Sequence, residues 1–319
     1  MTNNMQDPGA HGLALARRRR FVRKLLVDKY LYMMLFPLIV FLLIFRYWPM
    51  YGVIIAFKDF MFNKGILGSE WVGFKHFVNF ISNPSFPNIM GNTILISVKR
   101  IIFGFPMPII LALLLNEVRA HKYRKTLQTV MYMPHFVSWI VLYSLSIALF
   151  SAQTGALTVP LAHLLGIEQI NFLRDQSKFH GYLVISEIWK EIGFGSIIYI
   201  SALTGVDQQL YEAAHMDGAN RFQQIWHISL PCIIPVILIL FILRMGGILD
   251  AGFEQVLMLR NPFVMESAEI IDTFVFTQTL TNQNYSYAAA VGLFKNSIGI
   301  LFILGTNWIA RRVGEGSLV

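Results

Sequence analysis

Eight ionisable residues interrupt the apolar runs of this chain, and their types suit ligand binding. They are Lys99, Arg100, Glu187, Lys190, Glu191, Arg244, Asp250 and Lys295. A charge at the centre of a bilayer costs about 2.5–3.5 kcal/mol, so such residues often mark a pathway for a ligand or an ion. Five of the eight are cations and three are anions. This surplus favours an anionic ligand, while internal ion pairs or snorkelling at the interface are the alternative interpretation of each residue.

Polar and aromatic residues on the same segments could complete a ligand site. They are Asn92, Trp189, Phe194, Tyr199 and Asn296. Amide groups can hydrogen-bond to hydroxyl groups, and ring faces can line an apolar pocket. We therefore predict that the substrate pathway includes Lys99, Arg100, Glu187, Trp189, Lys190, Tyr199, Arg244, Asp250, Lys295 and Asn296.

Motifs for catalysis or for cofactor binding do not occur in the sequence. The histidines are scattered, without His-Glu-x-x-His spacing, and Cys232 is the single cysteine. No Gly-x-x-x-x-Gly-Lys-Ser/Thr run is present to bind nucleotide phosphates. We predict no catalytic residue, no metal site and no cofactor bound by this chain, and keep a membrane-embedded enzyme as an alternative.

The elements that carry these residues are long apolar segments. Of the 319 residues, 55% are hydrophobic and 14% are charged, and the mean hydropathy is +0.55. Soluble domains carry about 25% charged residues, so the composition predicts an all-α, polytopic membrane protein. Six stretches qualify as crossings, at about 30–46, 92–115, 130–150, 182–204, 232–250 and 288–310. We expect Pro106 and Pro108 to kink the second crossing.

The distribution of basic residues predicts the orientation in the membrane. With the N-terminus inside, cytoplasmic parts carry fourteen Lys and Arg and outer loops carry seven. Both termini are therefore expected in the cytoplasm. Residues 1–29 are predicted to be a basic cytoplasmic tail, 30–312 the transmembrane domain and 313–319 a second cytoplasmic tail. The basic block at 16–24 suits anionic membrane lipid, so the net charge of +8 does not indicate nucleic acid.

A compact polar stretch, YEAAHMDGANRFQQIWHISLPCIIP, lies between the fourth and fifth crossings on the predicted cytoplasmic side. Asp207 can cap a first short helix, and Gly218 permits a tight reversal. Phe222 and Trp226 then lie on one apolar face of a second helix, which Pro231 is expected to break. We predict a rigid knob that docks a soluble partner, with a loop packed on its own bundle as the alternative.

This stretch resembles the EAA signature of ABC importer permeases. In that signature E-A-A, three residues, G, nine residues and I-x-L-P follow in order. The positions that match are Glu212, Ala213, Ala214, Gly218, Ile228, Leu230 and Pro231. Asp217 and Ala219 extend the match to the D-G-A form that is frequent in the sugar-importing branch. The resemblance implies that a coupling helix at about 207–230 docks on an ATPase through Glu212, Ala213, Ala214, Asp217, Gly218, Phe222 and Trp226.

Other segments carry the same resemblance. They are YWPMYGVIIAFKDF at 47–60, WVGFKHF at 71–77, FPMPIILALLLNE at 105–117 and YMPHFVSW at 132–139. They are similar to the maltose-type branch of permeases, and within it to the group of lipoprotein-associated and alginate-importer permeases. The resemblance implies the type I importer fold of six helices and a second, similar permease. It also implies two cytoplasmic ATPase subunits that bind ATP and Mg, and an extracytoplasmic solute-binding protein.

The expected function is therefore import of an oligosaccharide by alternating access, in the cytoplasmic membrane of a bacterium. The surplus of cations favours an acidic oligosaccharide such as alginate or another oligouronate, and a neutral sugar or other solute is the alternative. A secondary transporter is the alternative from another class, although no internal repeat is visible. The outer segments 47–88 and 251–287 are expected to face the binding protein.

Overall fold

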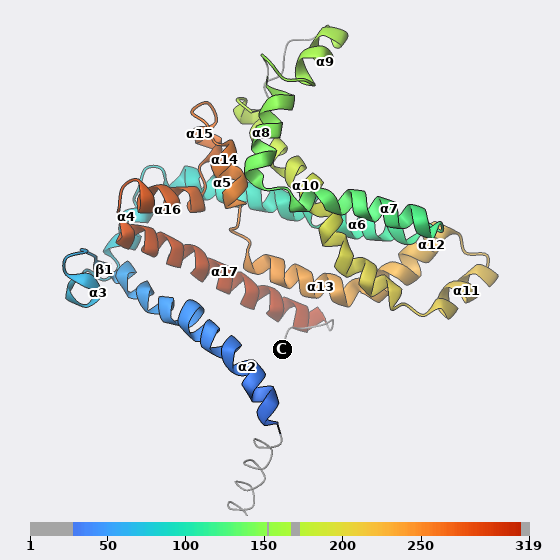
Figure 1. The fold of residues 1–319 in the computed structure, drawn as a ribbon, viewed down its shortest axis with the longest axis horizontal. Helices are drawn as coiled ribbons and strands as arrows, with labels where there is room; N and C mark the ends of the chain where they lie inside the picture. Colours follow the sequence, from blue (N-terminus) through green and yellow to red (C-terminus); the bar gives the residue numbers. More distant parts are fainter. Residues whose placement is uncertain (1–27, 152, 167–172, 314–319) are drawn as a thin grey trace, which may run out of the picture.

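The computed structural model describes residues 28–151, 153–166 and 173–313, and these parts of the chain are mostly helical (Figure 1). This confirms the all-α fold class. In the described ranges the strands are β1 (Lys58–Asp59) and β2 (Glu70–Trp71), which pair antiparallel. Most of the tail predicted at 1–29, and residues 314–319 of the second tail, lie outside the described residues.

The first span begins at Lys29 and is longer than its prediction. Helix α2 (Lys29–Leu42) continues through a π-helical turn, η1 (Leu43–Tyr47), and a 3-10 helix, η2 (Trp48–Phe57). The whole unit of 29 residues is apolar enough to cross a membrane. No residue of α2 is buried, and Figure 1 shows this helix diverging from the rest of the bundle. The span therefore offers most of its surface to lipid or to another subunit.

Prolines in the second and fifth spans are accommodated by π-helical turns. Helix α5 (Phe86–Lys99) leads through η3 (Arg100–Gly104) into α6 (Pro106–Asn116) as one span of 31 residues. Likewise α12 (Arg221–Gln224) leads through η5 (Ile225–Ser229) into α13 (Leu230–Gly246), a continuous helix of 26 residues. The predicted break at Pro231 is therefore wrong. A proline lacks the N–H of a normal helical turn, and the wider turn just before it changes the hydrogen-bond register without ending the helix.

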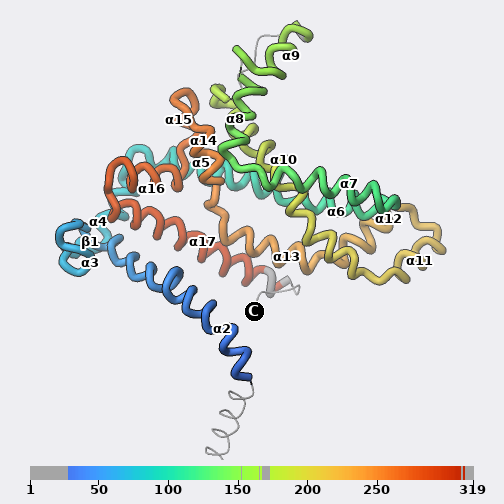
Figure 2. The backbone as a smooth tube through the Cα atoms, viewed as in Figure 1, coloured from blue at the N-terminus to red at the C-terminus, as the bar shows by residue number. Residues whose placement is uncertain are grey.

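The third span is bent. Helix α7 (His121–Tyr132) and η4 (Met133–Phe136) meet α8 (Trp139–Phe150) at an angle of 99°. Figure 2 shows α8 turning away from the line of α7 and running toward α9 (Thr158–Leu165). The chain then returns as α10 (Gln176–Thr204), an unbroken helix of 29 residues that passes both α7 and η4.

The outer segment predicted at 251–287 contains three short helices. They are α14 (Phe253–Leu259), α15 (Met265–Ala268) and α16 (Ile271–Leu280). The first outer segment holds α3 (Gly65–Gly68) and α4 (Lys75–Ile81) beside the two strands. Helix α17 (Tyr285–Val313) forms the last span. Several buried side chains of these outer helices, such as Val256 and Ile271, belong to the core, which makes the segment a cap on the bundle as well as an exposed surface.

Three apolar clusters hold the helices together. One joins α5, α10, α14 and α15, a second joins α4, α5, α16 and α17, and a third joins α6, α10 and α13. Close backbone contacts add to them, because a Cβ atom on Gly299 of α17 would meet the carbonyl oxygen of Gly246 on α13 at 2.7 Å. Small residues at helix crossings are typical of membrane bundles.

Four helical units in the described ranges are long and apolar enough to span a membrane, and the bent pair makes up to five. Helix α10 is not among them, and it carries Glu187, Lys190 and Glu191. The predicted count of six crossings therefore depends on α10, and it stays a prediction. The fifth helix ends at Gly246, before the boundary of 250 predicted from hydropathy.

Candidate functional site

The polar stretch between α10 and α13 forms two short helices with capped N-termini. Helix α11 (Gln208–Met216) begins after Asp207, whose Oδ1 accepts the N–H of Gln209 at 2.9 Å. Gly218 then adopts a φ of +81°. Asn220 caps α12 in a reciprocal pair with Gln223, with distances of 2.9 and 2.8 Å. The predicted helix–turn–helix knob is present, and we define it as residues 207–230.

The side chains expected to dock a partner lie on the surface of this knob. Glu212, Ala213 and Asp217 are exposed, and Ala214 is half-buried. Phe222 is 72% exposed and Trp226 is 59% exposed, and their rings stack with centroids 6.4 Å apart. The aromatic pair does not pack against its own bundle, contrary to the alternative of an ordinary loop. A hollow of about 310 Å³, bordered by Asp217, Gly218 and Gln223 among others, lies in the knob.

Three contacts hold the knob together and fix it to the bundle, and sequence reasoning predicted none of them. Tyr211 and Ser229 join α11 to η5 through their hydroxyl groups at 2.8 Å. Arg221 Nη1 donates to Glu117 Oε2 at 3.2 Å, which ties α12 to the end of α6. The side chain of Gln224 is buried beneath the turn. Because η5 leads into α13 without a break, a displacement of the knob is transmitted to the fifth span.

The largest cluster of interior charges surrounds Glu187 on α10. Its carboxylate lies 2.9 Å from Arg100 Nε and 3.5 Å from Arg244 Nη2. The Arg100 contact is close, but its angles are not those of a hydrogen bond. Arg100 also donates to the buried amide of Gln255, whose Nε2 in turn donates to the Leu183 carbonyl at 2.9 Å. The cluster therefore joins the second span, α10 and the fifth span to α14.

Two other predicted cations also have carboxylate partners. Lys190 Nζ lies 3.3 Å from Glu191 Oε1. Lys295 Nζ donates to both oxygens of Asp272 on α16 at 2.6 Å. Asp272 is a residue that sequence reasoning missed, because it belongs to a segment predicted as an outer loop. The internal pairing that was the alternative interpretation thus applies to Arg100, Lys190 and Lys295.

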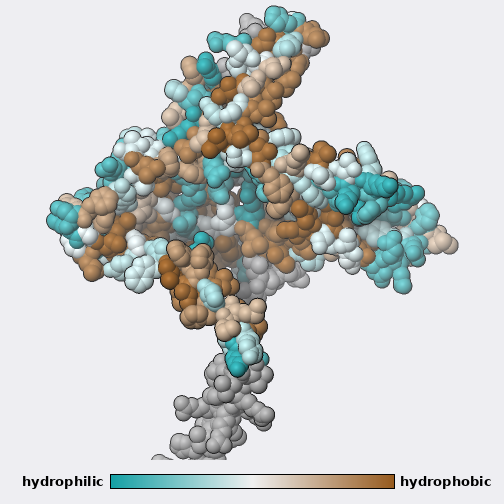
Figure 3. Space-filling model, viewed as in Figure 1, coloured by the Kyte–Doolittle hydropathy of each residue, from teal (hydrophilic) through white to brown (hydrophobic). Residues whose placement is uncertain are grey.

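The remaining predicted pathway residues divide between the core and the surface. Tyr199 is 4% exposed and packs in the α6–α10–α13 cluster, a placement that favours a structural role. Lys99 is half-buried and forms no ion pair with a described residue, and Arg244 is the more exposed member of its pair at 37%. Asp250 and Asn296 are exposed, and Trp189 is 49% exposed. In the space-filling view, hydrophilic residues line a hollow near the centre of the molecule (Figure 3).

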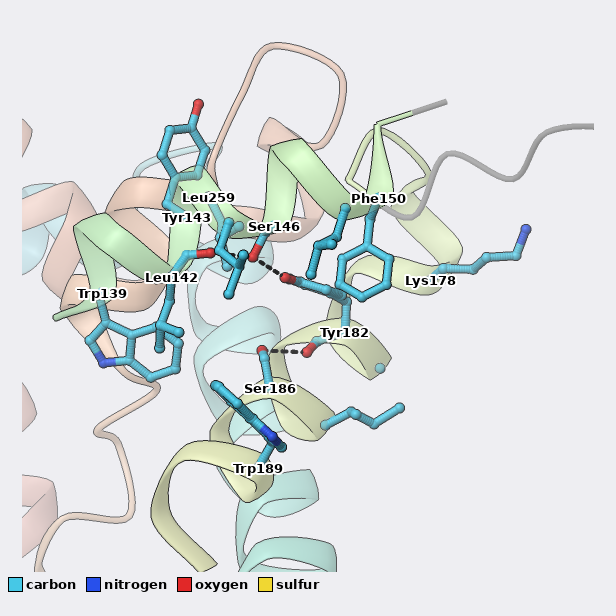
Figure 4. A pocket seen from close by; sticks show the side chains of 14 residues that line it. Trp139, Leu142, Tyr143, Ser146, Phe150, Lys178, Tyr182, Ser186, Trp189 and Leu259 are labelled. Atoms are coloured by element: carbon cyan, nitrogen blue, oxygen red, sulfur yellow. Dashed lines mark hydrogen bonds between the residues drawn. The ribbon is translucent and has the colours of Figure 1, made fainter. Parts of the chain in front are cut away.

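A half-open, mostly apolar cavity of about 680 Å³ lies between α8 and α10 (Figure 4). Its lining includes the rings of Trp139, Trp189, Tyr182 and Phe150. Figure 4 shows the Lys178 side chain extending away from the other lining residues. Sequence reasoning identified only Trp189 of these rings, although Trp139 and Tyr143 at a spacing of four residues carried a helical signal.

Comparison with known proteins gives a family and close relatives. Residues 104–315 match the model of the binding-protein-dependent transport system inner membrane component. The chain is 46% identical over 291 residues to Protein LplB of Bacillus subtilis (strain 168), covering 91% of each chain. It is 45% identical to the polygalacturonan/rhamnogalacturonan transport system permease protein YteP of the same organism, over 94% of this chain and 93% of YteP.

Solved structures agree with these relatives. The chain is 38% identical to a chain of a bacterial ABC transporter involved in the import of the acidic polysaccharide alginate. The TM-score is 0.84, and the match covers 92% of this chain and 99% of that one. A bacterial alginate ABC transporter in complex with a periplasmic protein that binds an alginate pentasaccharide gives 37% identity and a TM-score of 0.85, covering 94% and 100%. The match covers two thirds of the sequence and includes both the knob and the spans that it joins, so the chain belongs to the family of binding-protein-dependent transport system inner membrane components.

Proposed function

We propose that this chain is the permease subunit of an ATP-driven ABC importer and that it moves an oligosaccharide into the cytoplasm. It pairs with a second, similar permease in the cytoplasmic membrane of a bacterium, with both termini in the cytoplasm. Two separate ATPase subunits bind ATP and Mg and hydrolyse the ATP. An extracytoplasmic solute-binding protein delivers the sugar to the outer segments 47–88 and 251–287. The chain itself is a transport component without a catalytic residue.

The observation that carries this proposal is the geometry of the knob. Glu212, Asp217 and the Phe222–Trp226 pair are exposed on the knob, whose helices α11 and α12 lie at the right in Figure 1, an end of the molecule that is largely hydrophilic in Figure 3. Exposed aromatic side chains beside acidic groups are typical of a protein interface. The EAA register of 212–231 and membership of the family support an ATPase subunit as the partner that fits this surface.

The helices around the knob suggest how ATP binding opens and closes the pathway. Helix α10 enters the knob after Gly205, and the helix from α12 through α13 leaves it without a break. When the two ATPase subunits close on ATP, their movement displaces the knob together with the ends of α10 and α13. The bundle then changes between inward-open and outward-open arrangements. A sugar shifts this equilibrium only through its different affinities for the two arrangements.

An acidic oligosaccharide is the substrate class that we propose. YteP is named for polygalacturonan and rhamnogalacturonan, and the alginate importers are named for an acidic polysaccharide. In this chain three of the five interior cations are held closely by carboxylates, which leaves Lys99 and the exposed side of Arg244 available to a uronate. Trp189, Asp250 and Asn296 are exposed and complete the proposed contacts. A neutral sugar is the second candidate.

The first test measures ATP hydrolysis by the purified complex of both permeases and the ATPase subunits, reconstituted with its binding protein. Oligouronates are expected to stimulate hydrolysis, and neutral oligosaccharides of the same length are not. Stimulation by the neutral sugars alone would contradict the acidic substrate and support the second candidate, a neutral sugar. Uptake by this chain without ATPase subunits or ATP would contradict the importer and favour a secondary transporter.

The second test replaces the half-exposed interior cation. Arg244→Gln is expected to raise the KM for an oligouronate about tenfold, because a charge-assisted hydrogen bond contributes about 1.5–3 kcal/mol. The KM for any neutral sugar that is transported should change little. Lys122→Gln, on the exposed surface of α7, is the matched control. An equal loss for charged and neutral substrates would show that Arg244 acts through Glu187 and the bundle instead.

A further inference from the structure

The bend of the third span leaves backbone groups without the usual helical partners. The helix of α7 and η4 ends at Phe136, and α8 begins at Trp139 in a new direction, 99° away. Ser138 caps the new helix by accepting the N–H of Val141 at 3.4 Å. On the other side of the bend, the last carbonyl groups of η4 need donors from elsewhere, since an exposed carbonyl in a membrane is costly.

Helix α10 supplies that donor, and three of its side chains contact the bend. Lys190 Nζ donates to the carbonyl oxygen of His135 at 2.6 Å. The Nδ1 atom of the same histidine lies 2.8 Å from Glu191 Oε2, and its ring stacks on Phe194 with centroids 3.9 Å apart and planes 2° apart. We call His135, Lys190, Glu191 and Phe194 the α10 joint. One peptide group and one ring of the bend are thus held by three positions of α10.

A fifth position shows how closely the two elements approach. A Cβ atom at Gly193 would collide with the carbonyl group of Met131 on α7, so only glycine permits this contact. Lys190 also lies above the ring of Trp139, at 5.7 Å from its centroid, on the far side of the bend. The Lys190 side chain is 9% exposed, and its ammonium group contacts three groups of this chain. The joint therefore contacts both arms of the bent span.

The joint lies between the knob and the cavity of Figure 4. Below it, α10 continues as an unbroken helix to Thr204 and then enters the knob. Next to it, Trp189 of α10 and Trp139 of α8 both contribute to the lining of the cavity (Figure 4). A shift of α10 that leaves the joint intact must move the bend, and with it the wall formed by α8.

We propose that the α10 joint is a positioning device that makes α8 follow α10, so that the α8–α10 cavity keeps its width when movement of the knob displaces α10. Lys190 and Glu191 are positioning residues in this proposal, and neither contacts the substrate. The inference rests on the proposed importer function in one respect only, namely that closure of the ATPase subunits is what moves the knob and α10. The position of α8 relative to α10 can be measured whatever the substrate is.

The test measures a distance between spin labels on α8 and α10 in the complete importer complex. Labels are placed at Ile147→Cys and Ile198→Cys, two exposed positions outside the cavity and the joint, after Cys232→Ser removes the native cysteine. In the parent protein a narrow distance distribution is expected, with little change when ATP and Mg are added, because the two helices move together. In Lys190→Met the distribution should broaden and become dependent on ATP.

Matched variants separate positioning from substrate contact and from misfolding. Lys190→Arg can still donate to His135 and should restore the narrow distribution, Glu191→Gln should give an intermediate one, and Lys122→Met on the exposed face of α7 should leave it unchanged. If Lys190→Met lost uptake while its distances stayed as in the parent protein, the residue would act on substrate and the proposal would be wrong. The same holds if both distances and uptake stayed unchanged. A failure of the oligosaccharide assignment would change none of these distances.

Discussion

At the scale of single residues, the charges inside the membrane serve first to connect helices. Arg100, Glu187 and Arg244 come from three different helices, and Gln255 adds a fourth element. A buried ion pair is costly to break because the partner left behind keeps an uncompensated charge. The interior cations are thus largely neutralised before any ligand arrives, which leaves only Lys99 and part of Arg244 to attract one.

A glycine next to this cluster provides a sharp test. Gly252 has a φ of +79°, and a Cβ atom there would collide with the guanidinium group of Arg100. We expect Gly252→Ala to displace Arg100 from Glu187 and to lower the thermal unfolding midpoint in detergent, at a cost of about 3 kcal/mol or more. Gly292→Ala, in α17 with nothing near its Cβ position, is the control and should be neutral or slightly stabilising. Equal midpoints for the two variants would contradict the packing described for Arg100.

At the scale of secondary-structure elements, the second helix of the knob and the fifth span form one continuous helix. The π-helical turn at 225–229 absorbs Pro231, so the chain runs from Arg221 to Gly246 without interruption. Capping by Asp207 and Asn220 fixes where the two short helices of the knob begin. An exposed helix of nine residues would be marginal alone, and these caps with the Tyr211–Ser229 contact stabilise it.

The turn of the knob can be tested by a graded substitution at Gly218. Its φ is +81° and the space around its Cβ position is open, so a side chain there is limited by backbone conformation alone. Asparagine tolerates this conformation, whereas a β-branched residue costs at least about 1–2 kcal/mol. We expect Gly218→Asn to retain most uptake and Gly218→Val to lose most of it, with normal amounts of both proteins in the membrane. ATP hydrolysis and uptake should be measured on the same preparations, to show whether Gly218→Val loses the coupling between hydrolysis and transport. Equal uptake by the two variants would contradict a requirement for the left-handed backbone conformation at this turn.

At the scale of the whole molecule, the first span and the knob have surfaces that the rest of the described chain leaves uncovered. Helix α2 buries none of its residues, and the aromatic pair of the knob is exposed. Both features fit a subunit of a larger complex, with a partner in the membrane and another in the cytoplasm. The charge asymmetry of the loops predicts that the knob lies inside the cell and that the β1–β2 hairpin, with its exposed Leu67, lies outside.

This orientation predicts the accessibility of single cysteines. In a Cys232→Ser background, Leu67→Cys should react with a membrane-impermeant maleimide in intact spheroplasts. Lys122→Cys, exposed in the first turn of α7 on the predicted cytoplasmic side, should react only after the membrane is opened. Labelling of position 122 in intact spheroplasts, with position 67 protected, would show the opposite orientation. The knob would then lie outside the cell, where no ATPase subunit could bind it.

The sequence by itself determined the membrane-embedded all-α class, the approximate positions of most spans and the helix–turn–helix form of the knob. These follow from local properties, namely apolar length, loop charge, N-cap residues and a glycine at a turn, which need no knowledge of distant contacts. Tertiary structure alone decided which charges pair, because Arg100 finds Glu187 and Lys295 finds Asp272 only when separate helices pack together. It also decided the 99° bend of the third span and the cavity beside it. A bend held by the side chains of another helix is a property of packing, and hydropathy along one chain carries no signal for it.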